Sequence, residues 1–113
     1  MQIIDNLKVN EKLYIDKLDN GLTVMIIPKK AVQKKYVILG INYGSNDSTF
    51  IAQGEKDVTE VPKGVAHFLE HKMFEQENGK NSLDVLTSLG VNANAYTTND
   101  HTAYLYECTD NFY

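Results

Sequence analysis

The sequence centres on Gly64-Val65-Ala66-His67-Phe68-Leu69-Glu70-His71-Lys72-Met73-Phe74, where two histidines lie four positions apart and a glutamate directly precedes the second. On a helix with about 100° per residue, this stretch has two chemically different faces. One face carries the polar groups and one aromatic ring, namely His67, Glu70, His71 and Phe74. The opposite face is apolar, so we expect it to pack on the core through Val65, Phe68, Leu69 and Met73.

The polar face has the pattern H-x-x-E-H, the inverted form of a zinc-peptidase motif. Residues four apart on a helix have Cβ atoms about 5–6 Å from each other, so His67 and His71 can converge on one Zn²⁺. Glu70 can then reach a zinc-activated water and act as the general base. Two other interpretations of these residues stay open: histidines exposed on a solvated helix face, and a structural zinc site without turnover.

The bulk composition is that of one globular domain. The chain has 113 residues, 42% hydrophobic and 23% charged, with a net charge of −4. All the basic residues are lysines, which argues against nucleic-acid binding. No stretch reaches the about 20 apolar residues that a membrane span needs, and no signal segment is visible, so we expect no membrane partner and a cytoplasmic location. The lone cysteine, Cys108, lies in a strand-like run and is expected to be buried.

The residues before the motif predict strands. Asn20-Gly21 separates strand-like runs at 11–19 and 22–28, which predicts a hairpin with a type I′ turn. The run 36–43 is apolar at most positions on both faces, which predicts a central strand. Residues 44–60 are predicted to form a long loop, and Pro62 is predicted to lie in the first turn of the motif helix.

The residues after the motif predict a second helix and two more strands. The helix is expected to begin at Asn81 or Ser82 and to stop at Gly90. The strands are expected at 92–97 and 102–107, with a turn at Thr98-Asn99-Asp100-His101. The predicted fold is therefore α+β, a mostly antiparallel sheet with helices packed on one face.

Four separate segments resemble one protein family. Gly64 to Phe74, Leu89-Gly90, Asn94-Ala95-Tyr96-Thr97 and Thr102-Ala103-Tyr104 together resemble the pitrilysin/insulinase family of zinc metallopeptidases, in wording closest to its bacterial cytosolic members. The resemblance covers most of the chain, from the first hairpin to the end. It implies a partial pitrilysin-type half-domain and a zinc metalloendopeptidase, a hydrolase of peptides, as the full-length protein.

The resemblance also assigns residue roles. It implies that His67 and His71 are zinc ligands, that Glu70 is the general base, and that Asn94, Ala95 and Tyr96 form an edge strand to which a peptide substrate adds. The alternative for Asn94 is a turn or strand-end residue that bonds its own backbone. His101 is expected to be a solvent-facing turn histidine rather than an added metal ligand.

The family's third zinc ligand, a glutamate on a later helix, has no counterpart here. Glu75 and Glu77 lie too near the motif helix to fold back onto the metal, and Glu107 matches no ligand position of the family. Residues 109–113 resemble a helix N-cap and first turn. We therefore expect residues 1–113 to be a truncated N-terminal part of one metallopeptidase domain, inactive alone, whose partners are a homologous subunit or a missing C-terminal half. The alternatives are a non-catalytic peptide-binding homologue or partner subunit, and a small structural zinc protein.

Overall fold

The structure is a computed structural model that describes residues 1–109. It consists of two compact units, Met1–Gln33 and Lys34–Tyr113. The N-cap predicted at the end of the chain lies, apart from Thr109, outside the described residues. That the chain is part of one domain stays a prediction.

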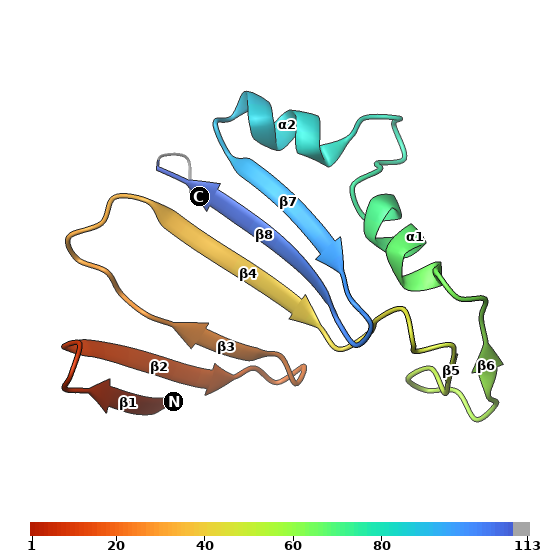
Figure 1. Cartoon of the computed structure of the whole chain (residues 1–113), viewed down its shortest axis with the longest axis horizontal. Coiled ribbons are helices and arrows are strands. Elements are labelled where there is room, and N and C mark those ends of the chain that lie inside the picture. Colours follow the sequence, from red (N-terminus) through yellow and green to blue (C-terminus); the bar gives the residue numbers. More distant parts are fainter. Residues whose placement is uncertain (110–113) are drawn as a thin grey trace. The chain divides into compact units, whose positions relative to one another are not determined.

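The first unit is a three-stranded antiparallel sheet of order β1-β2-β3 (Figure 1). Its strands are β1 (Gln2–Asn6), β2 (Glu11–Lys17) and β3 (Thr23–Ile26).

The predicted β2–β3 hairpin is present, but its predicted turn type is wrong. Gly21 has a φ of 90°, whereas Asn20 is not at positive φ. The Gly21 amide donates to Leu18 O at 2.9 Å, and the Leu18 amide donates to Leu22 O at 2.9 Å. This is a type I turn followed by a left-handed glycine, which needs positive φ at one residue instead of two.

The second unit contains a sheet of order β4-β8-β7, a small β5–β6 pair and two helices (Figure 1). The sheet is antiparallel throughout, which confirms the predicted α+β class with a mostly antiparallel sheet. The elements are β4 (Lys35–Ile41), β5 (Thr49–Phe50), β6 (Thr59–Glu60), α1 (Val65–Lys72), α2 (Ser82–Ser88), β7 (Asn92–Thr97) and β8 (Thr102–Cys108).

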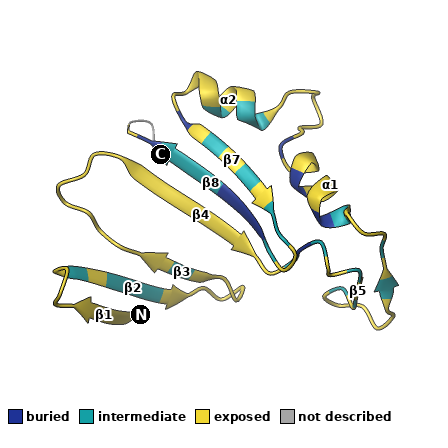
Figure 2. Cartoon of the chain, in the orientation of Figure 1, coloured by how far each residue is buried: buried dark blue, intermediate teal, exposed yellow. Residues whose placement is uncertain are grey.

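The middle strand of this sheet is β8, so the prediction of a central strand at 36–43 is wrong within the described residues. All seven residues of β4 are exposed, whereas β8 carries Ala103, Tyr104 and the predicted buried Cys108 (Figure 2). An apolar run shows that a strand can be buried on both faces, but not which strand lies in the middle. The predicted loop 44–60 also holds the short strands β5 and β6.

Helix α2 begins and ends at recognisable signals. The Asn81 side chain accepts a hydrogen bond from the Leu83 amide at 2.8 Å and caps α2 as predicted. At the other end Gly90 has a φ of 78°, and the Val91 amide returns to Leu86 O at 2.9 Å, which closes a Schellman motif. Helix α1 begins at Val65 after Gly64, so Pro62 lies before the helix and not in its first turn.

The two helices contact the sheet through β7, and α1 also contacts β8. In the β7–β8 register Ala93 pairs with Tyr106 and Ala95 with Tyr104. Side chains alternate between the faces of a strand, so the two alanines lie on the same face as Thr97. Their small size lets the helices approach the sheet closely.

The prediction that the apolar face of α1 packs on the core is wrong for three of its four residues, since only Val65 is half-buried. The residues that face the sheet are Ala66 and Glu70, while Phe68, Leu69 and Met73 are exposed. Phe74 is buried just after the helix and makes an edge-to-face contact with Tyr104 at 5.6 Å between ring centroids. The 100° spacing no longer applies to Phe74, because α1 ends at Lys72.

Candidate metal centre

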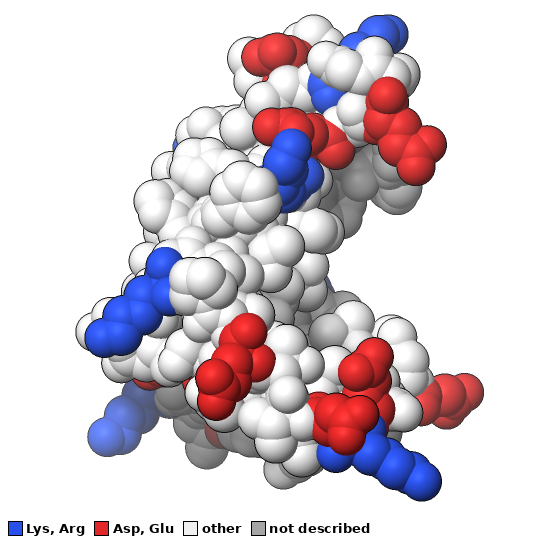
Figure 3. All heavy atoms as spheres, turned by 90° about the vertical axis from the view of Figure 1, so that its right-hand side faces the viewer, with Lys and Arg blue, Asp and Glu red and all other residues white. Residues whose placement is uncertain are grey.

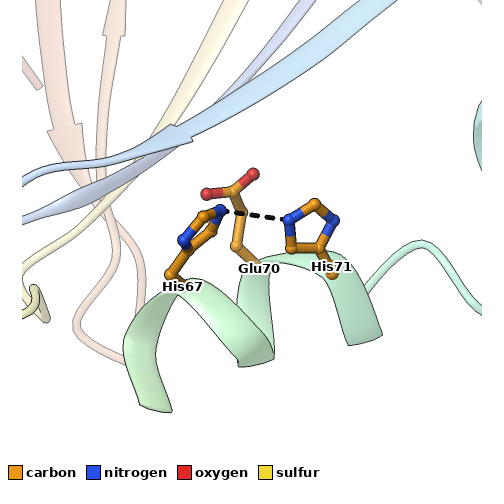
Figure 4. A group of neighbouring side chains, drawn as sticks. All are labelled: His67, Glu70 and His71. Carbon is orange, nitrogen blue, oxygen red and sulfur yellow. Dashed lines mark hydrogen bonds between the residues drawn. The ribbon is translucent and has the colours of Figure 1, made fainter. Parts of the chain in front are cut away.

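Helix α1 brings the three residues of the motif together. His67, Glu70 and His71 project from one side of the helix, with the carboxylate between the two rings (Figure 4). The Nε2 atoms of His67 and His71 are 3.0 Å apart, and the ring centroids are 4.8 Å apart. One ligand atom from each of the three side chains lies within 4.8 Å of the others. Both imidazoles are exposed to solvent, so a metal ion can reach them.

The donor atoms fit zinc. Two nitrogens at about 2.0–2.1 Å from a tetrahedral zinc ion are about 3.3–3.4 Å from each other. The observed separation of the Nε2 atoms is 3.0 Å, so small rotations of the rings bring them to that distance. Imidazole nitrogen and carboxylate oxygen are both ordinary zinc donors.

Glu70 differs from the histidines because it is buried, with 7% of its surface exposed. Its Oε2 accepts a hydrogen bond of 2.6 Å from the Thr97 hydroxyl, which comes from the end of β7. The Thr97 oxygen lies 3.3 Å from that of Thr102 on β8, and the Thr102 hydroxyl donates to Tyr43 O at 2.9 Å. The carboxylate is therefore anchored on the sheet side by a hydroxyl group.

The surroundings of Glu70 affect a neighbouring tyrosine. Burial raises the pKa of the Tyr104 hydroxyl, and the charges of Glu70 and Tyr106 raise it further. A tyrosinate at this place would lose hydration and face the carboxylate.

The other titratable residues named from the sequence lie elsewhere. His101 is half-buried in the β7–β8 turn, where its Nδ1 lies 2.7 Å from Asp100 Oδ1 and 2.9 Å from Thr98 Oγ1. Within residues 1–109 it belongs to no metal-binding group. Lys72 pairs with Glu75 at 2.6 Å. Glu107 pairs with Lys34 at 3.0 Å, so two of the three carboxylates considered as ligands are engaged in ion pairs.

Charges of both signs occur across the face of the molecule that Figure 3 shows, with uncharged side chains between them. No helix among the described residues is both long and apolar enough to cross a membrane.

The residues expected to bind substrate lie on β7, which is an edge strand of the described sheet. Asn94 and Tyr96 are exposed, and Ala95 is half-buried. The Ala95 amide donates to Asn94 Oδ1 at 2.9 Å, so Asn94 makes a local bond to the backbone, but it lies inside β7 and not in a turn or at a strand end.

Two residues of the site were not assigned a role from the sequence, Thr97 and Thr102. Both stand in segments that carry the family resemblance, and they pair with each other in the β7–β8 register. That pairing could be predicted from the two strands and the turn. The contact of Thr97 with Glu70 could not, because it joins residues 27 positions apart.

Comparison with known proteins agrees with this picture. The family model for the insulinase peptidases, described as "Insulinase (Peptidase family M16)", matches residues 28–112. YmfH of Bacillus subtilis, named as a zinc protease, is 42% identical over 104 residues, which cover 92% of this chain and 24% of YmfH. Core protein I of the mitochondrial ubiquinol-cytochrome-c reductase complex of Euglena gracilis is 37% identical over 62 residues, 52% of this chain and 13% of that protein.

A solved structure is also similar. The crystal structure of a protein described as an M16-like peptidase from Alicyclobacillus acidocaldarius superposes with a TM-score of 0.78 at 39% identity, over 88% of this chain and 23% of that one. The chain thus spans about a quarter or less of each of these proteins. These comparisons confirm the predicted family and fold class. The name of YmfH and the His-x-x-Glu-His group both support zinc as the cofactor.

Proposed function

The chain belongs to the insulinase family of peptidases, family M16, and from this we propose that it carries the zinc-binding and proton-accepting part of a peptide-hydrolysing active site. The observation that carries the proposal is the convergence of two Nε2 atoms 3.0 Å apart beside a buried carboxylate on one helix. In the whole protein the activity is that of a zinc metalloendopeptidase, and we expect the protein to be cytoplasmic.

In this proposal His67 and His71 hold the zinc ion. Catalytic zinc sites commonly use three protein ligands, and the group within residues 1–109 comprises these two histidines and Glu70. Because we assign Glu70 to proton transfer, we place the third ligand at a residue outside this range. Residues 1–113 alone should therefore bind zinc weakly and show no peptidase activity.

Glu70 is the proposed general base. When bound, zinc lowers the pKa of a water molecule to about 7 and polarises a peptide carbonyl. With its Oε2 occupied by Thr97, Glu70 accepts the water proton on Oε1 as the water attacks the carbonyl. It then delivers that proton to the leaving amine.

The peptide is proposed to bind along β7. An edge strand offers unpaired backbone groups, so an extended peptide can add to Asn94, Ala95 and Tyr96 as a further strand. Backbone hydrogen bonds hold peptides of many sequences. The amide of Ala95 is bonded to the Asn94 side chain, so Asn94 would turn away if that amide binds the peptide.

A second candidate comes from a different class. Core protein I is named as part of a ubiquinol-cytochrome-c reductase complex and not as a peptidase. The second candidate is thus a non-catalytic peptide-binding homologue or partner subunit. The intact set of His67, Glu70 and His71 favours the peptidase.

The test uses the natural protein that contains this chain. We expect it to contain zinc and to cleave a quenched fluorescent peptide, and a chelator should stop cleavage until zinc is restored. Glu70→Gln should keep the zinc and lower kcat by about 10²–10⁴-fold, the usual contribution of a general base. Glu75→Gln, an exposed carboxylate paired with Lys72, is the matched control and should leave kcat unchanged. Full activity of Glu70→Gln would contradict the proposal.

A further inference from the structure

We infer that Thr97 is a positioning residue that holds the carboxylate of Glu70 in the orientation needed to accept a proton. The inference rests on the proposed function, because it gives the general base a partner. It concerns a residue of the sheet, outside the metal-binding helix.

The first observation is the hydrogen bond itself. Thr97 Oγ1 donates to Glu70 Oε2 at 2.6 Å, the length of a strong bond from a hydroxyl to a charged oxygen. Glu70 is buried, and a buried carboxylate without a partner is costly. The bond therefore selects one orientation of the side chain. It occupies Oε2 and directs Oε1 away from the hydroxyl.

The second observation is that the Thr97 hydroxyl has one proton to donate and that Glu70 is its nearer acceptor. Its other polar neighbour is Thr102 Oγ1, at the longer distance of 3.3 Å. Thr102, which is buried, already donates its own proton to Tyr43 O at 2.9 Å. The Thr97 proton is therefore directed to Glu70.

The third observation is a close backbone approach that fixes Tyr43. A Cβ on the next residue, Gly44, would lie 2.4 Å from the amide nitrogen of Asp100, so only glycine lets this segment contact the β7–β8 turn. The Ser45 amide then donates to Thr98 O at 2.9 Å. These backbone contacts hold Tyr43 O where Thr102 can reach it.

The fourth observation is the place of Thr97 in the chain. It is the last residue of β7, directly after the proposed substrate residues Asn94, Ala95 and Tyr96. The strand that is proposed to receive the peptide thus also fixes the general base. Strand β7 therefore positions both the peptide and, through Thr97, the carboxylate of Glu70.

The test compares Thr97→Val with Thr97→Ser in the natural protein. Valine keeps the shape and removes the hydroxyl, so kcat should fall by about 10–100-fold, the value of a hydrogen bond to a charged group. KM and zinc content should stay within about twofold, since neither the ligands nor uniform peptide binding is changed. Serine keeps the hydroxyl and should restore kcat to within about threefold of the original value.

Thr98→Val is the matched control. The Thr98 hydroxyl bonds Asp100 and His101 in the turn and makes no bond to Glu70. The Thr98→Val variant removes a hydroxyl group from the residue next to Thr97, and its kcat should not change. An equal loss in Thr98→Val, an unchanged kcat in Thr97→Val, or a failure of Thr97→Ser to restore it would overturn the inference.

A measurement without metal or substrate completes the test. In the metal-free protein, Thr97→Val and Glu70→Ala should be coupled by about tenfold in the unfolding equilibrium constant, because each removes the same hydrogen bond. Additive effects would overturn the inference. If Glu70→Gln leaves hydrolysis intact, the proposed function fails. If it stops hydrolysis and Thr97→Val does not lower kcat, the inference alone fails.

Discussion

On helix α1 Glu70 is 7% exposed and Phe68 is 60% exposed, although carboxylates ordinarily face water and phenyl rings ordinarily face a core. The face of Glu70 and Ala66 lies on the sheet, and the face of Phe68, Leu69 and Met73 is exposed. Lys72 extends over the Phe68 ring at 5.9 Å and covers part of it.

The difference shows what the sheet offers to the helix. Beneath the buried face, β7 presents alanine and threonine side chains instead of large apolar ones. A helix that must come close to such a strand fits through Ala66, and Glu70 is tolerated because Thr97 satisfies it. Of the polar side chains on α1, Glu70 is buried against the sheet, while His67 and His71 stay exposed.

The largest expected effect comes from removing a metal ligand. His71→Ala leaves one histidine on the helix. Loss of a residue that only hydrogen-bonds a metal ligand weakens metal binding by about 10–100-fold, so loss of the ligand itself should weaken zinc binding by more. Hydrolysis should be lost with it. Zinc content after dialysis measures the effect, and Phe68→Ala, one turn back on the exposed face, is the control. Full zinc occupancy in His71→Ala would break the assignment of the polar face.

A second prediction compares two phenylalanines. Phe74 is 7% exposed and packs on Tyr104, so Phe74→Ala should lower the free energy of unfolding by about 3 kcal/mol. Phe68→Ala, at an exposed position, should change it by no more than about 0.5 kcal/mol. Urea unfolding of both variants measures the difference. Equal losses would show that the exposed face of α1 is covered in the natural protein.

The smallest expected effect concerns pH. The pKa of Tyr104 is raised in the folded state, first by burial and then by Glu70, so the folded protein keeps the proton more tightly than the unfolded chain. This contribution to stability is present below the unfolded pKa of about 10 and is lost as the pH rises through the folded value. Urea unfolding between pH 9 and 11 should therefore show a steeper loss than in Tyr104→Phe. Tyr36→Phe, at an exposed position of β4, is the control, and equal slopes in all three proteins would contradict the prediction.

Much of the fold could be predicted from local signals. Asn81 and Gly90 mark the ends of α2, and the strands at 92–97 and 102–107 agree with β7 and β8, because caps and strand patterns depend on neighbouring residues. The type of the turn at Gly21 and the place of β4 at the edge of the sheet were predicted wrongly. The turn type depends on backbone torsions that the Asn-Gly sequence does not fix. The position of β4 depends on the order of the strands in the sheet.

The sequence by itself determined the reactive group. His67, Glu70 and His71 converge because residues three and four apart on any helix share a face, whatever the helix packs against. Only the tertiary structure decided which face of α1 is buried, which strand lies at the edge, and that Thr97 meets Glu70. Those facts depend on contacts between distant segments, which periodicity along one helix does not encode.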